Sequence, residues 1–313
     1  MQNTVFNPYK TFLLTSFALI AFAANSVFCR LALGDQQVDA GSFTVIRLLS
    51  GSIFLGLFLA VKHFIVDPKK ANRAEIDNQP STIDKKSTGS WLNATWLFIY
   101  AMTFSYAYIQ LDTATGALVL FATVQVTMLL SRVLKGHLLT RAELIGLILA
   151  VAGFVFLLAP QLSSPSLIAF ALMCLSGISW AFYTLAGKES LDPTADTIFN
   201  FFRTLPFIIL FAVINIDATF LTLEGVLYAI LSGVFASALG YLLWYQALTA
   251  LRHNVAAVVQ LLVPVLAAVA GFIFLEESVS AVFVISSVII LSGILLVIKN
   301  PELKFSTAIK YEK

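Results

Sequence analysis

Apolar segments of about 20 residues recur along the whole chain, and this recurrence limits the possible folds more than any other feature. A helix of that length matches the hydrocarbon core of a bilayer, which is roughly 30 Å thick. Strands of membrane barrels are only about 10 residues long and alternate in polarity, so they do not fit segments as uniform as these. Because 59% of the residues are hydrophobic and 12% are charged, against about 25% charged in soluble domains, the sequence predicts an integral membrane protein.

The apolar segments predict an all-α fold with ten membrane-spanning helices. They lie near residues 11–33, 42–61, 92–110, 114–132, 142–159, 166–186, 196–214, 223–246, 254–274 and 280–298. Most of the connections are short. The long one, residues 62–90, mixes Lys, Asp, Asn, Ser and Thr with few apolar residues. This composition predicts a flexible loop that buries too little surface to fold.

The placement of Lys and Arg predicts the orientation in the membrane. All of them except Arg30, Arg47 and Arg203 lie in the alternate connections and the tails that share a side with the N-terminus. Basic residues in short loops stay on the cytoplasmic side. We therefore expect both termini to be cytoplasmic. The net charge of +2 does not indicate a nucleic-acid partner, because the basic residues are spread over these connections.

The chain repeats itself after about residue 160. The repeat places residues 25–32 on 179–186, Arg47 on Arg203 and Tyr106 on Tyr241. It predicts two five-helix halves, residues 1–160 and 161–313. Five spans are an odd number, so the second half enters the membrane upside down relative to the first. Inverted repeats are typical of secondary transporters, whose substrate site lies near the midplane between the halves.

The three arginines within the spans have two explanations. Arg47 and Arg203 lie a few residues inside their spans, where a guanidinium can reach the interface or form a structural ion pair. Alternatively, each binds an anionic or zwitterionic substrate near one mouth of a shared pathway, because a guanidinium binds a carboxylate through two parallel hydrogen bonds. Arg30 reaches the same outer vestibule or pairs with Asp35 or Asp39.

Other polar and aromatic residues within the spans are candidates for substrate binding. They are Asn25, Tyr106, Gln125, Trp180, Tyr183, Asn200, Tyr241, Trp244 and Gln260. The amides alternatively hold helices together, which is worth about 1 kcal/mol each, and the aromatic residues alternatively belong to interfacial belts. Pro206 and Pro264 each remove a backbone hydrogen bond within a span and are either hinges for alternating access or fixed bends.

The spans hold no Asp or Glu near their middle, and Asp112 and Glu143 lie at span ends. The sequence therefore gives no support for proton coupling through an acid at the midplane, and uniport or exchange is as well supported as proton antiport. No phosphate loop, metal-ligand spacing or catalytic constellation is present, so we expect no cofactor, no metal and no enzymatic activity.

The chain resembles EamA-type members of the drug/metabolite transporter superfamily. The resemblance rests on the ten-span plan, the segment Asn-Ser-Val-Phe-Cys-Arg-Leu-Ala-Leu at residues 25–33, the repeated arginine, and the turn at residues 136–140 before a span containing glycine. It implies a multi-pass transporter of the bacterial inner membrane that moves amino acids, organic acids or similar amphipathic metabolites, commonly outward, as a monomer or homodimer. Uptake or exchange, and a receptor or scaffold without transport, are the alternatives.

Overall fold

The computed structural model describes residues 8–61, 89–136, 138–158, 166–188, 190, 192–251 and 259–299. Most of the predicted loop 62–90, His137 within the predicted turn, and the beginning of the ninth predicted span lie outside these residues. Helices make up most of the described chain. This follows from the apolar sequence, because within a bilayer a backbone can satisfy its hydrogen bonds only internally.

Helices lie at each predicted span. In chain order they are α1 (Pro8–Gly34), α2 (Ala40–Val61), α4 (Trp91–Ala107), α5 (Thr113–Leu134), α6 (Arg141–Leu158), α7 (Ser166–Lys188), α8 (Pro193–Ile214), η3 (Ile216–Ala218), α9 (Leu223–Leu231), η4 (Ser232–Leu239), α10 (Gly240–Ala250), α12 (Leu262–Leu275) and α13 (Ala281–Lys299). Six described stretches, within α1, α2, α5, α7, α8 and the α9–η4–α10 segment, are long and apolar enough to cross a membrane.

The third and the eighth predicted spans differ from the observed helices in an informative way. The third ends at Ala107 instead of residue 110, and the carbonyl oxygens of Tyr108 and Ile109 beyond its end accept hydrogen bonds from Arg30. The eighth is continuous from α9 to α10 but contains a π-helical turn, η4, in its middle. Apolar periodicity does not reveal a π turn, and such turns occur frequently at functional sites.

Side-chain caps fix where several helices begin. Thr140 and Glu143 form a capping box at the start of α6, with each side chain accepting a backbone N–H of the other residue. The Asp192 side chain caps α8 by accepting from the N–H of Ala195 at 3.0 Å. Glu143 is also fully buried and lies 3.1 Å from the guanidinium of Arg132. Glu143 therefore joins the end of α5 to the beginning of α6 through an ion pair.

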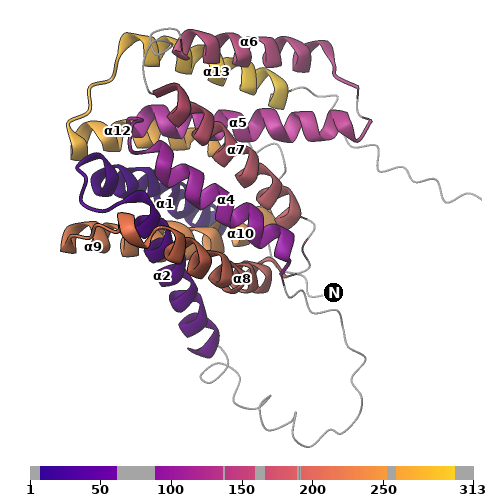
Figure 1. Ribbon diagram of the computed structural model, residues 1–313. Coiled ribbons are helices and arrows are strands. Elements are labelled where there is room, and N and C mark those ends of the chain that lie inside the picture. Colours follow the sequence, from indigo (N-terminus) through magenta and orange to yellow (C-terminus); the bar gives the residue numbers. More distant parts are fainter. Residues whose placement is uncertain are drawn as a thin grey trace, which may run out of the picture.

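Helices α6 and α13 lie side by side at one edge of the bundle (Figure 1, top). Gly146 and Gly293 allow this approach, because a Cβ built on Gly146 would lie 2.4 Å from the carbonyl oxygen of Gly293. In the interior, α1 packs against η4, α10 and α12, and α2 packs against η4 and α8. The polar residues described next lie where α1, α2, α4 and η4 meet.

Candidate functional site

Arg47 on α2 is enclosed in the bundle, with only 1% of its surface exposed. Its Nε donates a hydrogen bond to the Ser237 hydroxyl at 3.0 Å. Its Nη2 donates to the hydroxyl oxygens of Tyr100 at 3.1 Å and Tyr241 at 3.5 Å. One guanidinium is thus contacted by α4, η4 and α10, and these partners lie 53 to 194 residues from Arg47 in the sequence.

No described Asp or Glu forms an ion pair with Arg47. The guanidinium carbon lies 5.2 Å from the ring centre of Tyr100 and 5.0 Å from that of Phe104, so the cation faces two aromatic rings. Its Nη1 has no hydrogen-bond partner. The interfacial explanation of Arg47 is therefore wrong, because the side chain is buried among helices, and no acidic residue of the described chain supports the ion-paired explanation.

Two glycines allow α2 and η4 to approach closely enough to form this site. A Cβ on Gly233 would lie 2.2 Å from the carbonyl oxygen of Arg47, and one on Gly51 would lie 3.0 Å from the carbonyl oxygen of Gly233. Only hydrogen fits at these two positions without a shift of backbone. The contact places the π-helical turn directly beside Arg47, so that Ser237 reaches its Nε.

Asn25 on α1 completes the hydrogen-bond network. Its side-chain nitrogen donates to the Tyr100 hydroxyl at 3.3 Å, and its side-chain oxygen accepts from the Ser232 hydroxyl at 2.6 Å. A buried amide needs such partners, because an unpaired polar group away from water costs about 1 to 3 kcal/mol. We call Asn25, Arg47, Tyr100, Ser232, Ser237 and Tyr241 the Arg47 cluster.

An aromatic wall adjoins the Arg47 cluster and consists of Phe22, Trp180, Tyr183, Tyr241 and Trp244. The Trp180 ring lies 4.7 Å from that of Tyr241, 4.9 Å from that of Tyr100 and 5.6 Å from that of Tyr183, measured between ring centres. The Phe22 ring lies 5.8 Å from that of Trp244. All members of the wall are at most 6% exposed. The interfacial-belt explanation is therefore wrong for Trp180 and Tyr241, which face other helices.

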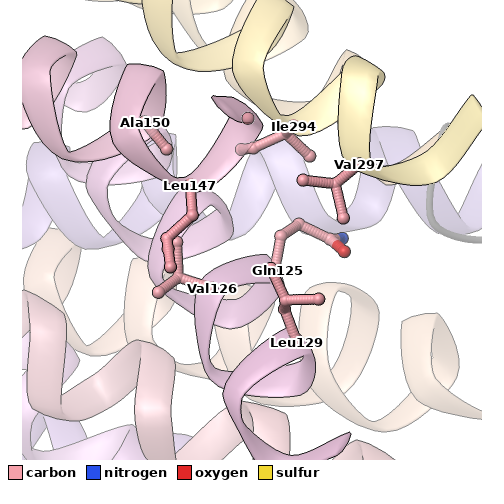
Figure 2. A pocket seen from close by; sticks show the side chains of 8 residues that line it. Gln125, Val126, Leu129, Leu147, Ala150, Ile294 and Val297 are labelled. Carbon is pink, nitrogen blue, oxygen red and sulfur yellow. The ribbon is translucent and has the colours of Figure 1, made fainter. Parts of the chain in front are cut away.

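Gln125 and Gln260 lie in a different place. The Gln125 side-chain nitrogen donates to the Gln260 oxygen at 3.5 Å and so joins α5 to the residues preceding α12. Gln125 also lines an apolar crevice between α5, α6 and α13, where its side chain extends toward Val297 (Figure 2). No residue of this crevice belongs to the Arg47 cluster. The pairing of the two amides therefore supports the explanation in which they hold helices together, not the one in which they share a site with Arg47.

Asn200 and Arg203 lie near the beginning of α4. The Asn200 side-chain oxygen accepts from the backbone N–H of Ser90 at 2.8 Å. The Arg203 guanidinium lies 5.8 Å from the ring centre of Trp91, and its Nη1 donates to the carbonyl oxygen of Phe199 at 3.4 Å. Both side chains thus connect α8 to the N-terminal end of α4.

Tyr106 does not join Arg47, although the repeat aligns it with Tyr241. Its hydroxyl donates to the Asn215 side chain at 3.3 Å, beyond the end of α8. Tyr100, six residues earlier in α4, contacts Arg47 instead. Sequence analysis missed Tyr100, Ser232 and Ser237. A search for polar groups one or two helix turns away from Tyr106 would have found Tyr100, whereas no sequence signal marks the π-helical turn that brings Ser237 into reach.

Arg30 pairs with Glu277 and Asp112, not with Asp35 or Asp39. Its Nε lies 3.3 Å from a Glu277 oxygen, and its Nη2 lies 3.9 Å from an Asp112 oxygen. Both Glu277 oxygens accept from the backbone N–H of Thr113, at 3.1 and 2.9 Å. Burial raises the pKa of the Glu277 carboxyl, and this effect outweighs the opposite influence of the Thr113 hydrogen bonds and of Arg30.

The two prolines occupy different positions in their helices. Pro206 lies in the middle of α8, which continues through it. Pro264 lies in the first turn of α12, which begins at Leu262 directly after a turn at Leu261. No group of three or more His, Cys, Asp or Glu residues that could hold a metal ion is found in the described part of the chain.

The chain is similar to known proteins over nearly its whole length. An uncharacterized protein of Pseudomonas aeruginosa is 43% identical over 289 residues, which cover 92% of this chain and 94% of that protein. An uncharacterized transporter of Archaeoglobus fulgidus is 27% identical over 300 residues, covering 92% and 96%. The model of the EamA-like transporter family matches residues 167–299.

A crystal structure with 18% sequence identity shares the fold, with a TM-score of 0.57 over 90% of this chain and 96% of that one. The long apolar helices, the match to the family model and the similarity to a transporter therefore all indicate a membrane transporter. They confirm the expectation of a multi-pass membrane transporter that was drawn from the sequence. The chain belongs to the EamA-like transporter family.

Proposed function

We propose that the protein exports a small metabolite, such as an amino acid, an organic acid or a similar amphipathic compound, across the bacterial inner membrane. One observation carries this proposal: Arg47 is a buried cation without an acidic partner among the described residues, and it contacts helices from both halves of the chain. Charged side chains at membrane depth are costly and usually mark substrate pathways. Membership of a transporter family supports transport rather than an enzymatic activity.

The proposal includes two inverted five-helix halves, residues 1–160 and 161–313. The helix packing supports this division, because contacts recur when each helix is exchanged for its counterpart in the other half. The contact of α4 with α7 corresponds to that of α10 with α1, and the contact of α5 with α7 corresponds to that of α12 with α1. The family match supports it as well, since it begins in α7, ends with α13 and covers the second half only.

The substrate site in this proposal is the Arg47 cluster with the aromatic wall. Both adjoin the contact between α2 and η4, which are the second helix of the first half and part of the third helix of the second half. Because the site residues are enclosed, substrate entry requires the helices to separate on one side at a time, which is alternating access. Pro206 and Pro264 are proposed hinges, and Asn200 with Arg203 would lie near the cytoplasmic opening.

Orientation follows from the distribution of Lys and Arg, which supports cytoplasmic termini. The Arg47 cluster includes no Asp or Glu, so exchange or uniport is a simpler mechanism than direct proton antiport at this site. The proposed partners are a small-molecule substrate and the lipid bilayer, with no nucleic acid, and the protein would function as a monomer or homodimer.

Counterflow in proteoliposomes tests the proposal. Vesicles containing the purified protein would be loaded with unlabelled phenylpyruvate, phenylalanine or phenethylamine, and entry of the same labelled compound would be followed. We expect at least one of these to enter faster than into protein-free vesicles. Entry no faster than in protein-free vesicles for all three would contradict the proposal. Vesicles sorted by orientation would then distinguish export from uptake.

A further inference from the structure

The polar atoms left unpaired around Arg47 are mainly hydrogen-bond donors. Arg47 Nη1, Trp180 Nε1 and Trp244 Nε1 are buried and have no hydrogen-bond partner. A guanidinium and an indole N–H can donate but cannot accept. Buried donors without acceptors are costly, so their occurrence in one connected group of side chains indicates that a ligand supplies the missing acceptors.

Several acceptor oxygens of the Arg47 cluster already accept a hydrogen bond. The Asn25 side-chain oxygen accepts from Ser232, and the hydroxyl oxygens of Ser237 and Tyr241 accept from Arg47. The Tyr183 hydroxyl has no partner in good hydrogen-bond geometry, although Asn200 and Thr197 lie close to it, and it can donate or accept. An ammonium group has three N–H donors, so it would find few acceptors here and would lie near the Arg47 cation. The site therefore disfavours amines.

Charge balance limits the anion as well. The site carries one positive charge, and no described carboxylate pairs with it. A ligand with a single negative charge neutralises it, whereas a dianion would leave an excess negative charge in a low-dielectric interior. The Phe22 ring meets those of Trp180 and Trp244 edge to face, with ring centres 5.9 and 5.8 Å apart, and these rings provide an apolar surface next to the Arg47 cluster.

We infer that the substrate is an amphipathic monocarboxylate carrying at least one further acceptor oxygen, as in a 2-oxo or 2-hydroxy acid. Its carboxylate binds Arg47 Nη1, the further oxygen accepts from an indole N–H, and its apolar part packs on the aromatic wall. This inference rests on the proposed function, because it assigns the substrate class of the same site. It selects organic acids over amino acids and amines.

A matched set of ligands that share one carbon skeleton tests the inference. The purified full-length protein would be titrated with phenylpyruvate, 3-phenylpropanoate, phenylalanine and phenethylamine, and its melting temperature recorded, because a ligand that binds the folded state raises it. We expect phenylpyruvate to bind most tightly, followed by phenylpropanoate, and the zwitterion and the amine to bind at least about 10-fold more weakly, given the strength of hydrogen bonds to charged groups.

Variants separate the contributions of charge and of the indole donors. Arg47→Lys keeps the charge and removes the guanidinium, while Trp244→Phe keeps a ring and removes the N–H. We expect Arg47→Lys to weaken phenylpyruvate binding by about 10-fold or more, and Trp244→Phe to weaken it by about 2- to 10-fold. The controls are Arg141→Gln, at an exposed arginine, and Trp96→Phe, whose ring stacks on Phe182 and belongs neither to the Arg47 cluster nor to the aromatic wall. Neither control should change binding.

The outcomes distinguish this inference from the proposed function. Tighter binding of phenylalanine or phenethylamine than of phenylpropanoate would overturn the inference while leaving transport intact. The absence of a melting shift with all four compounds would also overturn it. Failure of counterflow, with the anions still preferred in binding, would contradict the proposed function but not the assignment of the ligand class. If Arg47→Lys fails to fold, the Trp244→Phe comparison decides.

Discussion

Arg47 and Arg203 occupy corresponding positions in the two halves of the chain, yet their surroundings differ. Arg47 is 1% exposed, donates to three hydroxyls and has one nitrogen unpaired. Arg203 is partly exposed, lies over the Trp91 ring and contacts a backbone carbonyl of its own helix. A repeat can therefore preserve a residue while its role changes, because the role depends on which helices surround it.

The sharpest test of this comparison removes the buried cation. In Arg47→Met, we expect counterflow of a transported substrate to fall by about 100-fold, because a charge-assisted contact to the substrate is lost. We expect the free energy of unfolding to stay the same or to increase, because a buried charge without an acidic partner stabilises little. Flux is measured by counterflow and stability by thermal melting. If Arg47→Met lowered the melting temperature but the folded protein still showed normal counterflow, the functional assignment would be contradicted.

A second test moves the helix that holds Arg47. In Gly233→Ala, the new methyl group would clash with the carbonyl oxygen of Arg47 and with the Ser50 hydroxyl. We expect the free energy of unfolding to fall by about 1 to 3 kcal/mol, as for other overpacked sites, with a loss of flux as Ser237 shifts. Gly56→Ala is the matched control, because its Cβ would lie 3.4 Å from the flexible Phe202 ring. Equal effects of the two substitutions would argue against a tight contact of α2 with η4.

The third test applies the same change to the other arginine. In Arg203→Gln, we expect flux to change by less than about 3-fold and the free energy of unfolding to fall by about 0.5 to 1 kcal/mol, the size of a partly exposed cation–π contact. Counterflow and thermal melting of Arg203→Gln, measured in parallel with Arg47→Met, show how much larger the effect of Arg47 is on flux and on stability. A loss of flux as large as that of Arg47→Met would restore the symmetric model, in which both arginines bind substrate.

Arg30 provides a third setting, in which the arginine has an acidic partner. Burial raises the pKa of Glu277. The stabilisation that the Glu277 carboxyl contributes is therefore fully present below its pKa in the unfolded chain. It is lost as the pH rises through the higher pKa that this carboxyl has in the folded protein. We expect this to shift Tm by about 2 °C or less in a chain of this size. Glu277→Gln should remove this pH dependence, whereas Glu276→Gln, at an exposed neighbouring position, should not.

Sequence analysis located several members of the site but not their partners. Asn25, Trp180, Tyr183, Tyr241 and Trp244 were found because polar and aromatic groups in apolar spans are exceptions. Tyr100 was missed because the repeat pointed to Tyr106. The alignment of halves compares positions along helices, whereas a contact depends also on how each helix is rotated. The same limitation explains why Arg30 was paired with nearby acids instead of Glu277, which is 247 residues away.

Composition and the length of the apolar segments determined the class of this protein. A bilayer leaves a chain with so few charges little choice but helices of about 20 residues, and the cost of burying a cation marked Arg47 as unusual. Only the tertiary structure decided what surrounds Arg47. Its hydroxyl partners, its lack of an acid among the described residues, and the packing of Gly233 in the π-helical turn against α2 depend on close contacts between segments distant in sequence. Local patterns of hydrophobicity do not encode these contacts.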